Sequence, residues 1–441
     1  MQSKQKVHVI TMGCAKNLVD SEKLMAQLRL NNIEITHDIE DADVAVINTC
    51  GFIDAAKEES IEMILANVQR KGMGKLKKVY ALGCLTDRYM IELKKEIPEV
   101  DQFFGSSNNL AGVLAALGAE YKYELLGERV LTTPPHYAFL KISEGCDNPC
   151  SFCAIPIMRG KHVSRTVEDI VQEAKGLAER GVKELVVIGQ DTTYYGLDVY
   201  GERRLPALLE QLADLPGIAW VRLMYAYPAT FPRELLKVIA EHPHICKYLD
   251  MPVQHINDDV LKSMRRGITS RALRQLLDEL REAIPGVALR TTLIVGYPTE
   301  TTQAFDELLR FVEEVTFERL GVFAYSREEG TTAYPLGDPV PLKEKERRKA
   351  LVMTLQREIS TAYNRTLVGT TQRVLVDGRD GNVYVGRTER DAPEIDNAVL
   401  IAGDNPLPVG EFLDVAIERA SEYDVFGSPI MSHGHTRDHH P

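Results

Sequence analysis

The pattern of apolar and polar positions divides the chain into three regions of different character. From residue 1 to about residue 118, short apolar runs alternate with helical patterns, of which Asp20–Leu30 and Ala55–Val68 are the clearest. Strands that alternate with helices imply a parallel sheet, because a parallel pair needs a long crossover connection. We therefore predict an open parallel α/β domain over residues 1–118.

A second series of strands and helices follows the connection at residues 119–136. Amphipathic segments such as Thr166–Arg180 and Ser270–Ala283 separate six candidate strands, at residues 137–143, 184–189, 219–225, 245–250, 288–295 and 319–325. Six units are too few for the closed eight-stranded barrel, so residues 133–365 predict a partial (βα)6 barrel. Functional groups are expected at the carboxyl ends of its strands.

The third region is β-rich and follows a charged helical segment at Leu342–Asn364. Glycine, aspartate and asparagine turns separate its short strands, which are expected at Gln372–Asp377, Val383–Thr388, Ala398–Ile401 and Phe412–Glu418. This pattern predicts a small antiparallel β-barrel over residues 366–430. The His-containing tail at residues 431–441 is expected to be disordered. The fold class is therefore α/β with a terminal β-barrel.

Composition narrows the functional classes. No run of 18 apolar residues occurs, and the first six residues lack the apolar stretch of a signal peptide, so we expect no membrane span and a cytoplasmic location. In a reducing cytoplasm, cysteines bind metal rather than form disulfides. The net charge of −12 lowers the expectation of an RNA partner, since phosphate contacts need a basic surface.

Six of the seven cysteines form two sets of three. The first set follows three apolar runs and comprises Cys14, Cys50 and Cys84; the second is a tight CxxxCxxC after the first barrel strand and comprises Cys146, Cys150 and Cys153. Parallel strands would bring the first set together at one sheet edge. Buried core cysteines are the alternative for that set, and a buried inert thiol is the expectation for the remaining Cys246.

Each set has one thiolate fewer than a closed zinc or iron–sulfur site requires. A zinc ribbon would need a second CxxC pair, which the chain lacks. Two clusters with one open iron each would account for both shortfalls, and an open iron is available for chemistry.

At the CxxxCxxC motif the chain resembles the radical S-adenosylmethionine enzymes, in which three cysteines hold a 4Fe–4S cluster. The resemblance implies that Phe152 lies near the adenine of S-adenosylmethionine and that Gly189 and Gln190 lie where the methionyl amino group binds. The segment Gly189–Asp191 departs from the usual glycine-rich pattern with a glutamate. The resemblance further assigns the ribose to Gln254 and the adenine flank to Ile294 and Gly296. Apart from Phe152, each of these positions is also explained by ordinary turn chemistry at strand ends.

Over essentially its whole length the chain resembles the methylthiotransferases, and within them the RimO family. The segments that carry this likeness are Gly13–Asp20, Asn48–Ile53, Tyr248–His255 and Arg387–Asp396, with Ala15 where that family commonly has proline. The resemblance implies a TRAM-like terminal barrel, two 4Fe–4S clusters, S-adenosylmethionine as radical source and methyl donor, and sulfide or polysulfide as sulfur source. It implies methylthiolation at the β-carbon of an aspartate in small-subunit ribosomal protein twelve. An electron donor such as flavodoxin or ferredoxin is also implied.

Two other functions remain open from the sequence. One is methylthiolation of a tRNA adenosine by the same chemistry, and the other is a non-catalytic iron–sulfur protein associated with the ribosome. Residues 367–430 carry twelve acidic and five basic side chains. Such a surface would repel phosphate and steer a basic protein loop, which favours a ribosomal protein over tRNA.

Overall fold

The alternating pattern at the amino end forms a five-stranded parallel sheet in the order β2-β1-β3-β4-β5. The computed structural model describes residues 5–105, 110–122, 128–402 and 406–430. The elements of this first part are β1 (Lys6–Thr11), α1 (Ala15–Leu30), β2 (Glu34–Ile35), β3 (Val44–Thr49), α2 (Asp54–Gly72), β4 (Lys78–Gly83), α3 (Cys84–Glu96), β5 (Gln102–Phe103) and α4 (Leu110–Ala116). Helix α1 begins five residues earlier than its apolar pattern indicates.

The six expected barrel strands form one parallel sheet in the order β13-β12-β11-β10-β9-β6, which stays open between β13 and β6. Its strands are β6 (Tyr137–Lys141), β9 (Glu184–Ile188), β10 (Trp220–Leu223), β11 (Ile245–Asp250), β12 (Ala288–Val295) and β13 (Arg319–Ala324). A short β7–β8 ribbon (Ser143–Glu144 with Val163–Ser164) follows β6. The partial (βα)6 barrel is therefore confirmed.

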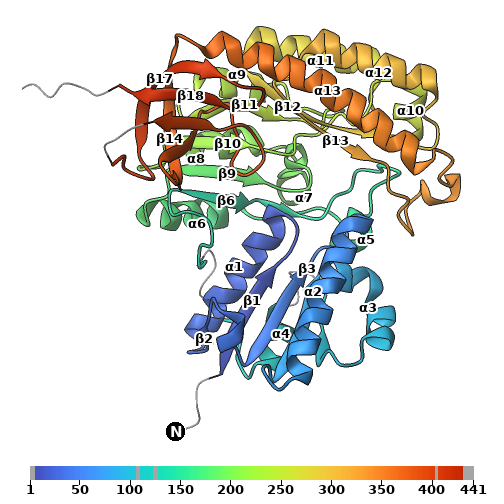
Figure 1. Ribbon diagram of the computed structural model, residues 1–441, viewed down its shortest axis with the longest axis vertical. Coiled ribbons are helices and arrows are strands. Elements are labelled where there is room, and N and C mark those ends of the chain that lie inside the picture. Colours follow the sequence, from blue (N-terminus) through green and yellow to red (C-terminus); the bar gives the residue numbers. More distant parts are fainter. Residues whose placement is uncertain (1–4, 106–109, 123–127, 403–405, 431–441) are drawn as a thin grey trace, which may run out of the picture.

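Helices cover the outer face of this open barrel (Figure 1). They are α6 (Val167–Glu179), α8 (Leu205–Ala213), α9 (Glu234–Glu241), α11 (Ser270–Ala283), α12 (Thr302–Val315) and α13 (Leu342–Leu367). The short helices α5 (Ile155–Arg159), α7 (Leu197–Tyr200) and α10 (Asp258–Ser263) lie in the connections that follow β6, β9 and β11. The leucines of α8 and α11 are fully buried against the sheet, as their amphipathic patterns predict.

The carboxyl-terminal region closes into a five-stranded barrel in the order β14-β15-β16-β18-β17. Its strands are β14 (Thr371–Asp380), β15 (Val383–Arg387), β16 (Val399–Ala402), β17 (Phe412–Ala420) and β18 (Val425–Pro429). The barrel is antiparallel except where β16 pairs with β18 in parallel. Sequence reasoning missed β18 because its five residues include a glycine and a proline, which are turn residues elsewhere.

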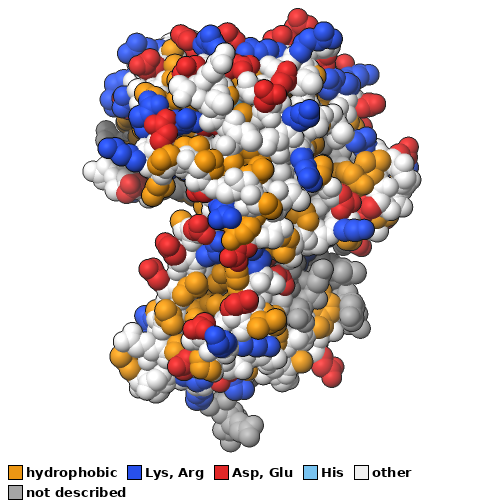
Figure 2. Space-filling view, turned by 90° about the vertical axis from the view of Figure 1, so that its right-hand side faces the viewer, with side chains coloured by type: hydrophobic (Ala, Val, Ile, Leu, Met, Phe, Trp, Pro, Cys, Tyr) orange, Lys and Arg blue, Asp and Glu red, His pale blue; other side chains and the backbone are white. Residues whose placement is uncertain are grey.

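The amino-terminal sheet lies below the barrel in Figure 1, with β1 and β3 running toward it, and the surface is indented where the two parts meet (Figure 2). Helix α1 contacts β6, and α3 contacts α5. The carboxyl ends of the amino-terminal strands therefore face the loops that leave the barrel strands. The two cysteine sets are carried by these two facing edges.

The terminal β-barrel packs against the opposite, amino end of the barrel strands. Its β15–β16 connection places Asp391 against Arg319 and Asp396 against Arg290, with all four groups largely buried. Tyr248 also donates to Asp396, at 2.7 Å. The acidic excess of this region is thus partly used in holding the two barrels together. Our expectation that the acidic residues of this region steer a basic protein loop is wrong for Asp391 and Asp396, because barrel arginines neutralise them.

None of the helices within the described ranges combines the length and apolarity that crossing a membrane requires. The tail expected to be disordered, residues 431–441, lies outside the described residues.

Candidate cluster and cofactor sites

The three dispersed cysteines meet where the amino-terminal strands end. Cys14 is the N-cap of α1, Cys84 is the first residue of α3, and Cys50 directly follows β3. Gly13, at φ 87°, makes this approach possible, since a β-carbon there would lie 2.7 Å from Cys50 Cβ. Cys14 and Cys84 therefore stand at the N-termini of two helices, and such helix ends favour negative charge.

Two asparagines fix the loops that carry these cysteines. Asn17 Nδ2 donates to the carbonyls of Met12 and Thr49, at 2.8 and 3.1 Å. Asn48 Nδ2 donates to the Asn17 carbonyl at 2.9 Å and to Ser21 at 3.0 Å. These buried amides join the strand ends of β1 and β3, so the spacing of the cysteines is built into the sheet edge.

The CxxxCxxC cysteines lie on a loop that turns over the carboxyl end of β6. The Cys146 amide donates to the Gly160 carbonyl at 3.2 Å, and the Cys153 amide donates to the Cys150 carbonyl at 3.2 Å. The Asp191 carboxylate accepts from Asn148 inside the motif at 2.7 Å and caps its own turn at Thr193. Asp191 therefore has a structural part in shaping this loop.

Burial disfavours free thiolates at both sites. It raises the pKa of Cys84 to about 12 despite the nearby Arg159 guanidinium, and it raises the pKa of Cys153 to about 12 and that of Cys146 to about 11. Bound iron would supply the positive charge that deprotonates them. Among the described residues, no three His, Cys, Asp or Glu side chains converge on a single metal ion. Three thiols from one loop or from neighbouring loops are the kind of donor set that holds an iron–sulfur cluster, so the chemistry of each set fits a cluster.

Two residues expected near an adenine come together in one apolar group. Phe152 and Ile294 are half-buried against a cluster that includes Tyr297 and Tyr325, whose rings meet edge to face with centroids 5.2 Å apart. Gly296 lies beside them at φ 73°, and a β-carbon there would overlap the Lys345 side chain. The structure thus brings Phe152, Ile294 and Gly296 to the same face of the barrel mouth.

The two glutamines expected to contact S-adenosylmethionine each carry a buried amide oxygen that has no hydrogen-bond partner among the described residues. Gln190 donates through Nε2 to Glu144 at 2.6 Å, while its Oε1 is unpaired. Gln254 has a φ of 72°, which is uncommon for a side chain larger than glycine. Buried polar atoms are normally paired, so these two oxygens fit a ligand that donates hydrogen bonds. Gly189 directly precedes Gln190 and packs against Ser143, since a β-carbon on Gly189 would be 2.8 Å from Ser143 Oγ.

Sequence reasoning missed a buried arginine between the two cysteine sets. Arg159, at the end of α5, donates from Nε to Cys84 Sγ at 3.2 Å and from Nη1 to Asp20 and Glu144 at 3.0 Å. It also donates to Asn17, and Lys141 pairs with both carboxylates. The only signal in the sequence is an arginine ending the otherwise apolar stretch after Cys153, at residues 154–158.

A second missed arginine contacts the barrel motif. Arg266 Nη1 donates to Cys150 Sγ at 3.2 Å, and its guanidinium lies over the Tyr227 ring, 4.4 Å from the centroid. The Tyr227 hydroxyl donates to the Arg266 carbonyl at 2.7 Å and lies 3.9 Å from Cys150 Sγ. One cysteine of each set therefore accepts a hydrogen bond from a buried arginine.

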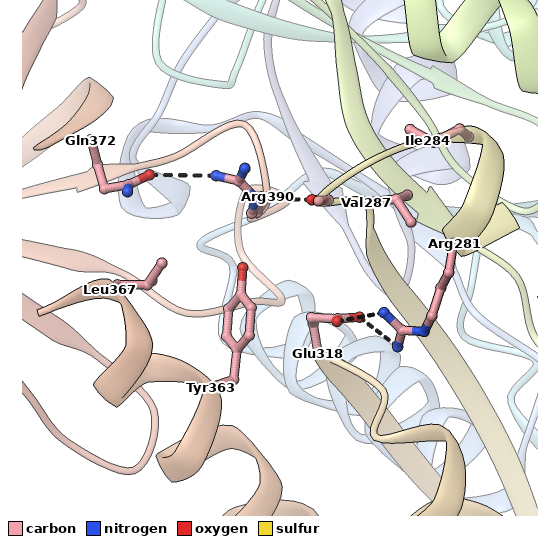
Figure 3. Close-up of a pocket in the computed structure, with 9 residues that line it drawn as sticks. Arg281, Ile284, Val287, Glu318, Tyr363, Leu367, Gln372 and Arg390 are labelled. Atoms are coloured by element: carbon pink, nitrogen blue, oxygen red, sulfur yellow. Dashed lines mark hydrogen bonds and ion pairs between the residues drawn. The ribbon is translucent and has the colours of Figure 1, made fainter. Parts of the chain in front are cut away.

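A pocket of about 300 Å³ lies away from both cysteine sets, between the amino ends of β12 and β13, the end of α13 and the terminal barrel. Figure 3 shows the Tyr363 hydroxyl pointing toward Arg390, with the Arg281–Glu318 ion pair to one side of the ring. Arg390 donates to the Gly286 carbonyl at 3.1 Å and to Gln372 at 3.4 Å, which ties the two barrels together. No cysteine lines this pocket.

Comparison with known proteins decides the family. Residues 140–312 match the radical SAM superfamily, residues 6–105 match the uncharacterized protein family UPF0004, and residues 368–430 match the TRAM domain. The ribosomal protein uS12 methylthiotransferase RimO of Flavobacterium johnsoniae is 54% identical over 430 residues, and that of Cytophaga hutchinsonii is 52% identical over 430 residues. Both comparisons cover 97% of this chain and 98% of the relative.

The chain belongs to the RimO family. This confirms the resemblance drawn from the sequence and makes the protein a radical SAM enzyme, a family whose members use a 4Fe–4S cluster and S-adenosylmethionine. Solved structures agree on the fold. The radical S-adenosylmethionine methyltransferase TsrM from Kitasatospora setae, solved with a tryptophan substrate and aza-SAM, matches with a TM-score of 0.56 at 13% identity. That match covers 86% of this chain and 79% of TsrM.

Proposed function

We propose that this enzyme methylthiolates the β-carbon of an aspartate in ribosomal protein uS12. The observation that carries the proposal is the identity of about half the residues, over nearly the full length, to RimO relatives, whose name gives uS12 as the protein they modify. The two facing cysteine sets support the same chemistry, since sulfur insertion needs a radical source and a sulfur carrier close to one substrate atom. The enzyme would act in the cytoplasm on a basic ribosomal protein.

In this proposal the three regions divide the work. Residues 1–118 hold one 4Fe–4S cluster through Cys14, Cys50 and Cys84. Residues 133–365 hold the other through Cys146, Cys150 and Cys153, and residues 366–430 form the TRAM barrel. When bound, the barrel cluster and S-adenosylmethionine supply a radical that removes hydrogen from an unactivated C–H bond, and the amino-terminal cluster supplies sulfur derived from sulfide or polysulfide.

The side chains around the barrel mouth would orient S-adenosylmethionine. Gln190 Oε1 is available to accept from the methionyl ammonium, and Gln254 Oε1 is available to accept from a ribose hydroxyl. Phe152 and Ile294 offer an apolar wall for the adenine and exclude water from it. Gly189 and Gly296 let Ser143 and Lys345 pack directly against the loops that carry these residues, because a β-carbon at either glycine would collide with those side chains.

Arg159 would keep the two halves of the site in register. It joins Cys84 and Asp20 of the amino-terminal part to Glu144, and Glu144 accepts in turn from Gln190. Burial alone would raise the pKa of Glu144, but the charges of Lys141 and Arg159 outweigh burial and hold that pKa well below its usual value. The carboxylate therefore stays ionised and able to bind both partners at neutral pH.

The preference for a protein over tRNA rests on the relatives' name and on what remains of the acidic surface. Asp391 and Asp396 are occupied by barrel arginines. Exposed carboxylates such as Asp380, Glu418 and Glu422 still give the TRAM barrel a negative outer face. Such a face disfavours phosphate contacts. Methylthiolation of a tRNA adenosine is the competing function.

The test offers reconstituted enzyme, S-adenosylmethionine, sulfide and a reductant to purified uS12 and to tRNA in parallel. We expect a gain of about 46 Da, one sulfur plus one CH₂, on a single aspartate of uS12 and no gain on tRNA. Deuterium placed on the β-carbon of that aspartate should appear in the 5′-deoxyadenosine. A mass gain on tRNA alone overturns the substrate, and deuterium retained in the protein overturns the position.

A further inference from the structure

A basic turn packs directly behind the barrel cysteines. Residues 262–274, which run from the end of α10 into α11, contain five basic side chains and no acidic one, in a chain whose net charge is −12. The turn is bound to the cysteine loop: the Ser151 amide donates to the Met264 carbonyl at 3.0 Å, and Ser151 Oγ donates to the Ser263 carbonyl at 2.9 Å. Its position relative to Cys150 is therefore fixed.

Three of these cations reach the surface without a partner. Lys262, Arg265 and Arg271 are exposed, and within the described part of the chain none of them forms an ion pair. Of the carboxylates on neighbouring elements, Glu279 pairs with Arg233 at 2.7 Å and Asp258 accepts from the Ser270 amide at 2.6 Å. The exposed cations are thus available to a negatively charged partner.

The same turn borders an apolar groove of about 530 Å³. The groove lies between the β10–α9 connection and the start of α11, and its apolar lining includes Pro228, Phe231, Ile268 and Leu276. Arg233, which is paired with Glu279, also lines it. The exposed Lys262, Arg265 and Arg271 lie beside the lining residues Gly267, Ile268 and Thr269 in the same turn. An apolar surface next to charged side chains is the usual make-up of a site for a transient protein partner. We call the groove together with Lys262, Arg265 and Arg271 the basic groove.

The basic groove is separated from a cluster cysteine by a single layer of side chains. Arg266, between the exposed Arg265 and Gly267, is itself 4% exposed and donates to Cys150 Sγ at 3.2 Å. Tyr227 precedes Pro228 of the groove lining, and its hydroxyl lies 3.9 Å from the same sulfur. An electron delivered at the groove therefore has a short, packed path to the barrel cysteines.

We propose that an acidic one-electron carrier protein docks on the basic groove and reduces the barrel cluster through the Arg266–Tyr227 layer. The proposal rests on the proposed function, since it requires a cluster at Cys146, Cys150 and Cys153. In the step, the carrier loses one electron and the cluster gains it, and no bond forms or breaks. Charge complementarity selects the carrier: an acidic surface is steered to this face and repelled by the rest of the acidic chain.

The experiment compares two triple variants with the wild type, using reduced bacterial flavodoxin as the carrier probe. The test variant is Lys262→Glu, Arg265→Glu and Arg271→Glu. The control makes the same charge change at exposed positions elsewhere that form no ion pair within the described ranges: Arg29→Glu, Lys175→Glu and Arg365→Glu. Binding is measured by titration at low and high salt. Formation of 5′-deoxyadenosine is measured with flavodoxin and, separately, with dithionite, a small reductant that needs no docking site.

We expect the test variant to bind flavodoxin at least about tenfold more weakly at low salt, with the difference shrinking at high salt. Its flavodoxin-driven rate should fall similarly while its dithionite-driven rate stays at the wild-type level. The variant Lys262→Gln, Arg265→Gln and Arg271→Gln removes the charges without reversing them, so flavodoxin binding should weaken less. Unchanged binding of the test variant, or equal weakening by the control, overturns the proposal. Absence of 5′-deoxyadenosine from wild type with dithionite would instead count against the proposed function.

Discussion

Replacing Arg159 by methionine should weaken the contact between the amino-terminal part and the barrel. Methionine has a similar volume but forms none of the ion pairs of the guanidinium. The Arg159 side chain is 2% exposed, and its guanidinium donates to Cys84, Asn17, Asp20 and Glu144. Removing one partner of a buried ion pair costs about 3–5 kcal/mol, because the remaining charge is left without compensation. Lys141 still neutralises both carboxylates in the variant. We therefore expect the free energy of unfolding to fall by about 3 kcal/mol, the lower end of this range.

The assay is urea unfolding of anaerobically purified protein, followed through its first transition, where the contact between the amino-terminal part and the barrel is lost. Arg159→Lys keeps the positive charge but not the planar guanidinium, so the free energy of unfolding should fall by less than in Arg159→Met. Arg357→Met is the matched control: Arg357 and Glu422 are about half exposed and 3.9 Å apart, and such pairs contribute about 0–1 kcal/mol. If Arg159→Met cost no more than Arg357→Met, Arg159 would not join the two halves.

Two further changes test other parts of the structure. Asp391→Asn leaves the buried Arg319 without its carboxylate, so it should destabilise the packing of the TRAM barrel by about 3 kcal/mol. Protease should then cut the α13–β14 junction faster than in the wild type. Unchanged cleavage would show that this ion pair does not fix the TRAM barrel. Gly83→Ala should prevent iron binding by Cys84, because Gly83 has a φ of 106° and a β-carbon there would lie 2.5 Å from the Thr49 carbonyl oxygen. The control Gly72→Ala, in α2, has open space for its β-carbon and should bind iron normally. Equal iron contents in the two variants would contradict this reasoning.

The parallel sheets could be predicted because each buried strand forms a continuous apolar run and each covering helix has one apolar face. Helix α11, expected at Ser270–Ala283, is observed over those residues because Thr269 caps it and four leucines line its buried face. Strand β18 could not be found in this way, since Gly427 and Pro429 hide its pattern.

The site was only partly predictable for a different reason. The cysteines stand out because thiol spacing and strand ends are visible in one dimension. The importance of Arg159 depends on Asp20 and Asn17, which lie about 140 residues earlier in the chain and meet it only in the folded protein. The acidic TRAM residues were misread for the same reason, because a charge count does not tell an exposed carboxylate from Asp391 paired with Arg319.

The central claim is that two cysteine sets hold two clusters with different tasks. The measurement that tests it most directly is the iron content of the wild type and of two triple alanine variants after full anaerobic reconstitution, read beside 5′-deoxyadenosine and methylthiolated uS12. We predict about eight irons in the wild type and about four in each variant. The variant lacking Cys14, Cys50 and Cys84 should still form 5′-deoxyadenosine but transfer no methylthio group. About four irons in the fully reconstituted wild type, or methylthio transfer by that variant, would contradict the account.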